Sequence, residues 1–224
     1  SKQSRLIIGP WGHAKNVFFP DGSSTENFRF VSIARSFDWF DRHLKERKVV
    51  PTSPVRIFVM GDNRWRDEQT WPLPRAVNTK LFLQSDGNAA DPSGDGQLLL
   101  EAPFDTHTPD VFTYNPLNPV PTRGGAFMGP GMAIKQQNTI ELRPDVLSYT
   151  SSPLAENVEV TGYVRATLVV STNAPSTDFT AKLVDVYPDG SAYNIADGIL
   201  RQTYDVGDQR VSIVIQLGAT SNVF

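Results

Sequence analysis

Apolar residues recur with two different periods, and the change of period divides the chain near residue 50. Residues 5–8 form a short apolar run that Gly9 and Pro10 end, which is typical of a strand. From residue 28 the apolar positions fall three or four apart and predict an amphipathic helix of about 16–18 residues. Basic residues gather at its end, where they suit the helix dipole. The apolar face of this helix consists of Phe30, Ile33, Phe37, Phe40 and Leu44.

A β pattern takes over after Pro51. Alternating runs bounded by Gly, Pro, Asp and Asn recur at short spacing, and Pro188-Asp189-Gly190 predicts a hairpin turn. Many strands joined by long connections indicate a mainly β fold, a two-sheet sandwich of the jelly-roll type. We expect strands near residues 55–60, 80–84, 138–142, 147–151, 157–171, 178–187, 192–204 and 209–217.

Two domains follow from this division. Residues 1–51 are interpreted as the last strand, a loop and a helix of an α/β domain, and residues 52–224 as the sandwich. A lone strand and helix cannot bury their apolar faces, so they either pack on the sandwich or belong to a domain that extends beyond this chain. The chain begins without Met and ends abruptly at Phe224, so we expect a piece of a longer protein.

Composition narrows the classes of function. The chain has 224 residues, 20% of them charged, and a formal net charge of −3. Without a basic run, nucleic acid is not expected as a partner. The absence of cysteine excludes a disulfide framework and a thiolate metal site. No apolar run reaches the ~18 residues that a transmembrane helix needs, so no membrane contact is expected. A cytoplasmic location is the default, with a secreted or periplasmic one left open.

His13 is the first candidate for chemistry. It lies on a loop directly after a strand and before a helix, between Gly12 and Ala14. A loop in that position projects an imidazole beyond the edge of a sheet, where it can act as a general base. An ordinary surface histidine is the competing interpretation. A serine nucleophile would require a Gly-x-Ser-x-Gly elbow, and none of the serines has that pattern. If His13 is catalytic, we expect its serine and acid outside this chain.

The other polar candidates are weaker. His43 falls on the exposed side of the predicted helix and is expected to be solvated, and His107 lies in a polar loop. The three histidines have no metal-binding spacing. The carboxylates of Asp86, Asp91 and Asp95 lack the pattern of a calcium loop and are interpreted as acidic turns.

Aromatic and charged clusters leave alternatives open. Residues 62–68 surround a tryptophan with charges, which favours salt-bridged packing between domains over catalysis. Residues 115–125 combine prolines with Gly124 and Gly125 and suit a contact loop. A further aromatic set would either line an apolar pocket or, as the favoured interpretation, pack in the core and at sheet edges: Trp65, Trp71, Phe82, Phe104, Phe112 and Tyr114.

Several separate motifs resemble one known family across essentially the whole chain. Residues 6–13 (Leu-Ile-Ile-Gly-Pro-Trp-Gly-His) resemble the histidine segment of the cocaine esterase/X-prolyl dipeptidyl aminopeptidase-type hydrolases, and residues 37–44 resemble the helix that follows it. Residues 55–61 with the tryptophans after them resemble the start of the family's C-terminal domain. Residues 118–125, 178–186 and 194–201 are similar to its loop and jelly-roll strands.

The resemblance implies an α/β-hydrolase with a helical cap and a C-terminal jelly roll that closes over the active site. It implies acyl transfer to water through an acyl-enzyme, with His13 as the general base and no cofactor or metal. The substrate would be a small ester, amide or peptide, Xaa-Pro dipeptides included. The serine elbow, the acid, the oxyanion hole and the cap are absent from this sequence. The family's jelly roll also continues past the position of Phe224, so the resemblance implies that the sandwich of residues 52–224 is truncated at its C-terminus. We therefore expect this chain to be inactive by itself and to need the missing α/β-hydrolase domain as its partner.

Two other roles remain open at this point. A jelly roll can bind carbohydrate, and Trp65 and Trp71 would then stack on a sugar from an exposed surface. A purely structural role would use the β domain for oligomerisation, with a second copy completing the truncated sheet. That role is compatible with the hydrolase interpretation.

Overall fold

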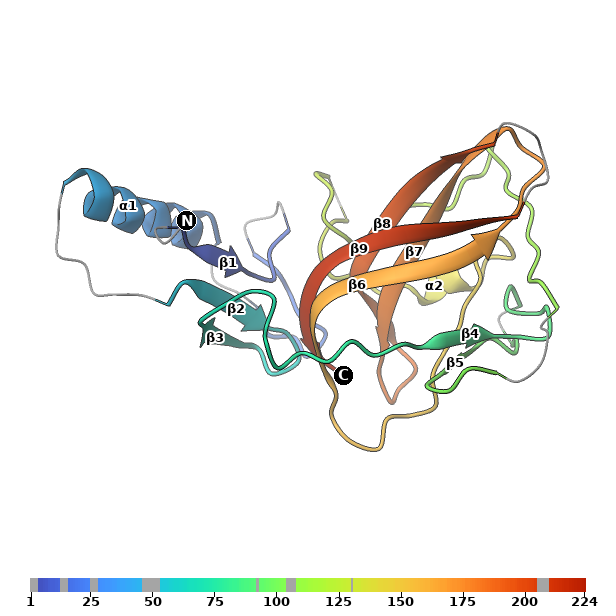
Figure 1. Cartoon of the computed structure of the whole chain (residues 1–224), viewed down its shortest axis with the longest axis horizontal. Coiled ribbons are helices and arrows are strands. Elements are labelled where there is room, and N and C mark those ends of the chain that lie inside the picture. The colour runs from blue at the N-terminus through green and yellow to red at the C-terminus, as the bar shows by residue number, and fades with distance from the viewer. Residues whose placement is uncertain are drawn as a thin grey trace.

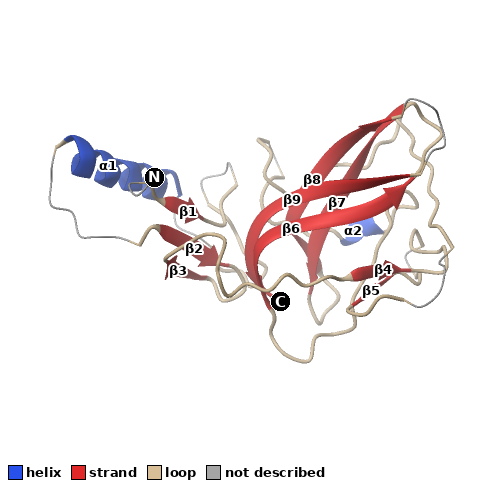
Figure 2. Ribbon diagram, in the orientation of Figure 1, coloured by secondary structure: helices blue, strands red, loops and turns tan. Residues whose placement is uncertain are grey.

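The elements form two groups that meet near the C-terminus (Figure 1). The computed structural model describes residues 4–12, 16–24, 28–45, 53–91, 93–103, 108–129, 131–204 and 210–224, with side chains in the long helix from Ile33 onward. A small sheet and the long helix occupy one end of the molecule, and the long strands of a sandwich occupy the other (Figure 2).

The small sheet is a βαβ unit with an added strand. Strand β1 (Leu6–Ile8) pairs in parallel with β2 (Val55–Val59), and helix α1 (Phe28–Leu44) lies between them in sequence. Parallel neighbours need such a crossover connection. Strand β3 (Arg64–Glu68) pairs with the other side of β2 in antiparallel register. The sheet therefore joins the two segments that the sequence separates near residue 51.

Strand β2 is buried on both faces, as its continuous apolar sequence requires. Val55, Ile57 and Val59 pack on one face together with Leu73. Phe58 packs on the other face, with residues that precede α1. The strand thus stands between two small cores.

Helix α1 has the predicted position and length, and Lys45 pairs with Asp41 in its last turn at 2.6 Å. Its predicted apolar face is not covered by the described residues. Ile33, Phe37, Phe40 and Leu44 are 50–74% exposed. The helix is amphipathic as predicted, but its apolar stripe faces solvent in this chain.

Four long strands form the sandwich. Strand β6 (Glu159–Val170) pairs with β9 (Val211–Val223), and β7 (Ser176–Val186) pairs with β8 (Ala192–Thr203). The two ribbons bury one shared core, in which Ile213, Ile215 and Leu217 of β9 alternate with outward-facing residues. These strands and the turn at Asp189 and Gly190 confirm the predictions for residues 157–217. The fold is mainly β with a C-terminal β-sandwich.

Two predicted strands are wrong. Residues 138–142 form a short helix, α2 (Asn138–Glu141), because the Gln137 carbonyl accepts hydrogen bonds from the Ile140 and Glu141 amides. Within residues 147–151 only Thr150 makes an isolated bridge, to Gln97. Strands β3 and β5 (Gln97–Leu99) were not predicted, and β5 pairs with the expected strand β4 (Phe82–Gln84).

The sandwich is joined to the small sheet by backbone and side-chain contacts. Met60 exchanges backbone hydrogen bonds with the end of β9, accepting from Val223 and donating to Ser221. Gly61 has φ +85°, and a Cβ built on it would lie 2.5 Å from the Val223 carbonyl oxygen. Arg66 of β3 binds both carboxylate oxygens of Glu159 on β6, at 2.7 and 2.6 Å. The salt-bridged packing predicted for residues 62–68 is therefore present.

Candidate functional site

The predicted general base, His13, lies outside the described residues, as do Ala14 and Lys15. The structure describes the chain on both sides of it. Gly12 follows the carboxyl end of β1, and the described chain resumes at Asn16. In α/β sheets the carboxyl ends of parallel strands are where ligands and catalytic loops gather. The position of the loop therefore suits the chemistry that the sequence predicts for His13.

Both flanks of this loop are fixed by aromatic packing. Before the loop, the Trp11 ring lies 5.5 Å from that of Trp65 on β3. After the loop, the Phe19 ring stacks on Phe58 of β2 at 5.6 Å, and Val17 is fully buried in the same cluster. The small sheet thus holds the loop at both ends.

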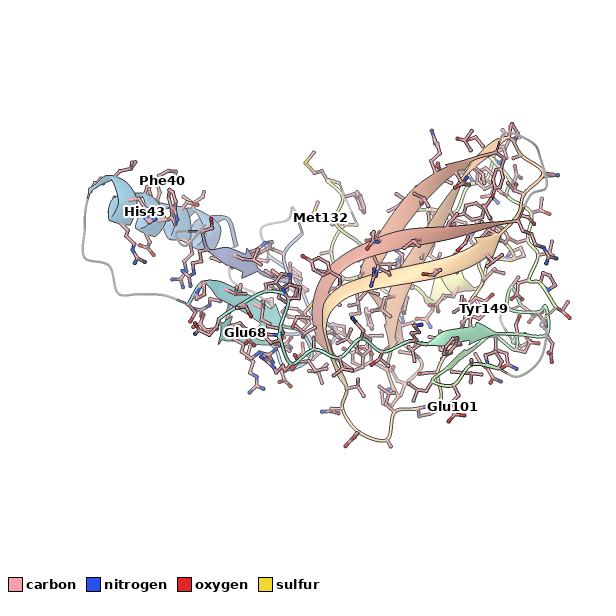
Figure 3. The ribbon with its side chains drawn as sticks, in the orientation of Figure 1. Phe40, His43, Glu68, Glu101, Met132 and Tyr149 are labelled. Atoms are coloured by element: carbon pink, nitrogen blue, oxygen red, sulfur yellow. The ribbon has the colours of Figure 1, made fainter. Side chains whose placement is uncertain are left out.

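A hairpin from the β domain lies close to Gly12, the last described residue before the loop. Residues 124–133 fold back on themselves through paired backbone hydrogen bonds between Gly125 and Ala133. A Cβ built on Gly12 would lie 3.4 Å from the Ala133 Cβ and 3.6 Å from the Met132 Cγ. Figure 3 shows Met132 on this hairpin, in the region between the small sheet and the sandwich. The β domain therefore contributes directly to the surroundings of the loop.

The base of the hairpin is anchored on β8 by two buried amides. The Asn194 Oδ1 accepts from the Lys135 backbone N–H at 2.7 Å and from Gln137 Nε2 at 3.1 Å, and its Nδ2 donates to the Ala133 carbonyl at 3.1 Å. Gln137 Nε2 also lies within hydrogen-bond distance of the carbonyl oxygens of Arg123 and Lys135. Because both side chains are almost fully buried, losing a partner would be costly.

Sequence reasoning missed this anchor. The Gly124-Gly125 pair was the available signal, since both residues have positive φ, but it was interpreted only as part of a contact loop. A Cβ built on Gly124 would lie 2.1 Å from Asn194 Oδ1. The glycine is therefore needed for close approach to a residue 70 positions later, which no local pattern reveals.

Three pKa shifts at the junction and in the β domain have identifiable physical causes. The hydrogen bonds from Arg66 lower the pKa of Glu159 to about 2. Burial lowers the pKa of Lys182, whose ammonium donates to the Arg123 carbonyl at 3.1 Å. Burial, followed by the hydrogen bond to Asp110, raises the pKa of the Tyr149 phenol. Each of these groups has a hydrogen-bond partner within the structure.

The remaining histidine predictions have different outcomes. His107 lies outside the described residues. His43 is described, and contrary to the expectation it is not freely solvated. Its ring meets Trp39 edge to face at 4.2 Å, and its Nε2 is buried without a hydrogen-bond partner among the described residues. Figure 3 shows His43 on α1, away from the sandwich.

The two tryptophans of the aromatic set serve packing, whereas two of its other members do not. Trp65 contacts Trp11 and Phe58, and Trp71 meets Tyr163 across the junction and donates to its hydroxyl at 3.2 Å. Neither tryptophan offers the flat exposed platform that the carbohydrate-binding alternative needs. Phe112 and Tyr114 are exposed, and Phe104 is outside the described residues.

The acidic positions behave as turn residues. Asp91 accepts hydrogen bonds from the Ser93 amide and hydroxyl, and Asp95 accepts one from the Asp86 amide. Within the described part of the chain, no three His, Cys, Asp or Glu side chains are grouped to hold a metal ion. The same residues include no helix long and apolar enough to cross a membrane.

Comparison with known proteins identifies relatives over the whole length. Residues 48–214 match the X-Pro dipeptidyl-peptidase C-terminal non-catalytic domain. The chain is 39% identical to a cocaine esterase from Rhodococcus sp. (strain MB1 Bresler), covering 99% of this chain and 41% of that protein. It is 28% identical to a putative serine esterase from Mycobacterium bovis (strain ATCC BAA-935 / AF2122/97), covering 88% of this chain and 31% of that protein.

Solved structures agree with the fold. An aminopeptidase from a marine sediment archaeon, Thaumarchaeota archaeon, superposes with a TM-score of 0.78 at 22% identity, covering 98% of this chain and 39% of that one. A CocE/NonD family hydrolase from Staphylococcus aureus superposes with a TM-score of 0.60 at 14% identity, covering 99% of this chain and 44% of that one. The chain thus spans well under half the length of each relative.

Proposed function

The chain belongs to the family of X-Pro dipeptidyl-peptidase C-terminal domains, and from that premise we propose that it serves a serine hydrolase of the CocE/NonD type. The full-length enzyme would cleave ester or amide bonds, Xaa-Pro dipeptidyl bonds among them, through an acyl-enzyme. This chain would supply the general base His13 and the β domain, and an upstream α/β-hydrolase domain would supply the nucleophile. The names of the curated relatives, a cocaine esterase and a putative serine esterase, support this class of reaction.

One structural observation carries the proposal: the βαβ unit is unfinished within this chain. Among the described residues only β2 pairs with β1, and none of them pairs with its other edge. The apolar stripe of α1 is exposed beside it. Parallel sheets are normally covered on both faces and extended by further strands. Both features favour a larger α/β domain continuing across β1, with residues 1–51 as its last part. Residues 52–224 would then add strands β2 and β3 to the small sheet and form the jelly roll.

The proposed mechanism assigns three steps to His13. The imidazole removes the proton from the upstream serine as that oxygen attacks the carbonyl carbon. It then returns the proton to the leaving alkoxide or amine. In the second half-reaction it activates water, which releases the acid and restores the serine. Packing of Trp11 and Phe19 on the small sheet supports this role, because a general base must be held within hydrogen-bond reach of its partner.

Replacing His13 in the full-length enzyme tests the proposal. With His13→Ala, kcat for a p-nitrophenyl ester should fall by about 10³-fold or more, while circular dichroism stays unchanged. His107→Ala is the matched control, since the sequence assigns His107 to a polar loop of the β domain, and it should retain activity. Full activity of the His13 variant would contradict the proposed role.

A further inference from the structure

The end of strand β9 joins the sandwich to the small sheet, and one carboxyl group lies against this joint. Met60, which directly follows β2, donates a backbone hydrogen bond to Ser221 and accepts one from Val223. Asn222 lies between those two residues and is 2% exposed, and its Nδ2 donates to Asp185 Oδ2 on β7 at 3.4 Å. The Asp185 carboxyl group is therefore one side chain away from the backbone bonds that connect the two parts of the molecule.

Asp185 is half-buried, and little in its surroundings stabilises a negative charge. The Asn222 amide is a single donor at a long distance. Within the described part of the chain, no basic side chain forms an ion pair with Asp185. Burial raises the pKa of this carboxyl group, and the Asn222 hydrogen bond only partly offsets the rise. The arginines of the joint bind other carboxylates: Arg64 binds Asp62, and Arg66 binds Glu68 and Glu159.

The other ionisable groups near Asp185 do not compensate its charge. Tyr187 lies two residues along β7, and Tyr193 is the partner of Asp185 on β8. Burial, followed by the negative charges of Asp185 and Asp21, raises the pKa of Tyr187, so its phenol is neutral in the physiological range. The nearest lysine on β7, Lys182, donates to a backbone carbonyl instead. Strand β9 contributes no ionisable side chain.

We propose that Asp185 makes the joint between the small sheet and the sandwich respond to pH. A neutral carboxyl group is tolerated in the closed joint, whereas a carboxylate favours an open joint in which water solvates both oxygens. Asp185 therefore stabilises the closed joint most below the ordinary pKa of 3.8, and this contribution is lost as the pH rises through the raised pKa. Each unit of difference in pKa between the two states corresponds to about a tenfold change in the opening equilibrium. This response does not depend on the reaction of the full-length enzyme.

A carbon-13 NMR titration of the parent chain tests the first requirement, a raised pKa. The Asp185 Cγ resonance should titrate above pH 3.8. The Cγ resonance of Asp178, which Arg201 binds through both carboxylate oxygens, should titrate below that value. The titration needs no variant, so it remains decisive if a substitution at Asp185 prevents folding. A midpoint for Asp185 at or below pH 3.8 would overturn the proposal.

Amide hydrogen exchange tests the second requirement, that ionisation opens the joint. The Met60 and Val223 amides both donate across it. Asp185→Asn preserves the shape of the side chain and removes its charge. At pH 8 the protection factors of both amides should be severalfold to about tenfold higher in the variant than in the parent chain. This ratio should fall toward one as the pH is lowered to 4.5, and a ratio that does not vary with pH would contradict the role of the charge.

Two comparisons separate the joint from the rest of the fold. Amides of residues 211–215, at the other end of β9, should exchange equally in Asp185→Asn and the parent chain, and an equal rise there would assign the effect to global unfolding. Asp178→Asn is the matched control, because it removes the same charge from the same strand at a pair whose Arg201 side chain is 72% exposed. It should leave the Met60 and Val223 amides unchanged at both pH values. The same pH-dependent rise in this control would assign the effect to net charge, and either result would overturn the proposal.

Discussion

Apolar residues are buried in the sandwich of this chain and exposed on its long helix. In the sandwich, Ile213, Ile215 and Leu217 of β9 are buried between two ribbons that both belong to the chain. In helix α1, Phe37 and Leu44 belong to an equally regular apolar stripe and are 64% and 74% exposed. The difference shows that the sandwich has its own core, whereas the described residues leave the apolar stripe of the helix uncovered.

Secondary structure and burial are therefore separate consequences of the sequence. The three-to-four spacing specifies the helix whether or not its stripe is covered. Burial depends on which other segments are present, and the described residues provide none that covers α1. A comparison of substitutions in the two regions tests this directly.

The largest effect is expected in the sandwich core. Ile215 is 0% exposed, and Ile215→Ala would leave a cavity between the ribbons. We expect it to lower the free energy of unfolding by about 2–5 kcal/mol, measured by urea denaturation of this chain. A loss below about 1 kcal/mol would mean that the ribbons are not packed as described.

A smaller effect is expected at the junction. Glu159→Gln removes a carboxylate that binds Arg66 in a bidentate pair, and the loss should be about 1 kcal/mol at pH 7, because both side chains remain partly exposed. The folded-state pKa of Glu159 is lowered from 4.5 to about 2. The stabilisation is therefore complete above pH 4.5 and disappears as the pH falls toward 2.

The control for Glu159 is an ion pair on the outer surface of the sandwich. Asp178 also forms a bidentate pair, with Arg201, but the Arg201 side chain is 72% exposed. Asp178→Asn should leave the urea midpoint unchanged both at pH 7 and as the pH falls toward 2. If Glu159→Gln and Asp178→Asn behave alike, the junction pair has no special role in joining the two regions.

The smallest effect in this chain, and the sharpest test of the comparison, concerns helix α1. Phe37→Ala should change the free energy of unfolding by no more than about 0.5 kcal/mol, because the ring is already exposed. In the full-length hydrolase the same substitution should cost about 3–5 kcal/mol if an upstream domain covers the stripe. Equal small effects in both proteins would show that nothing covers α1.

Regular elements with their own periodicity could be predicted from the sequence. Helix α1 and the strands β6 to β9 follow from spacing alone. Strand β3 could not, because its sequence is mostly charged, and its place in the sheet depends on pairing with β2 and on long-range contacts such as that of Arg66 with Glu159. At the helical turn of residues 138–141, the Asn138 side chain makes hydrogen bonds to Gly190 and Ala192, about 50 residues away in sequence. Local pattern cannot anticipate such long-range partners.

The candidate site could be predicted only in part for the same reason. The histidine loop is marked by a strand, a Gly-Pro break and a tryptophan, all close together in sequence. The hairpin that lies close to Gly12 is more than 100 residues away in sequence, and its anchor Asn194 is about 60 residues further along. Both became visible only when the fold brought them to the loop.

The most direct test of the central claim is fluorophosphonate labelling of the purified chain and of the full-length enzyme, followed by intact mass measurement. These probes modify a serine that a base has activated. We predict no adduct on the 24.8 kDa chain and a stoichiometric adduct on the full-length enzyme that depends on His13. A stoichiometric adduct on the isolated chain would mean that one of its own serines is activated, and it would contradict the assignment of the nucleophile to an upstream domain.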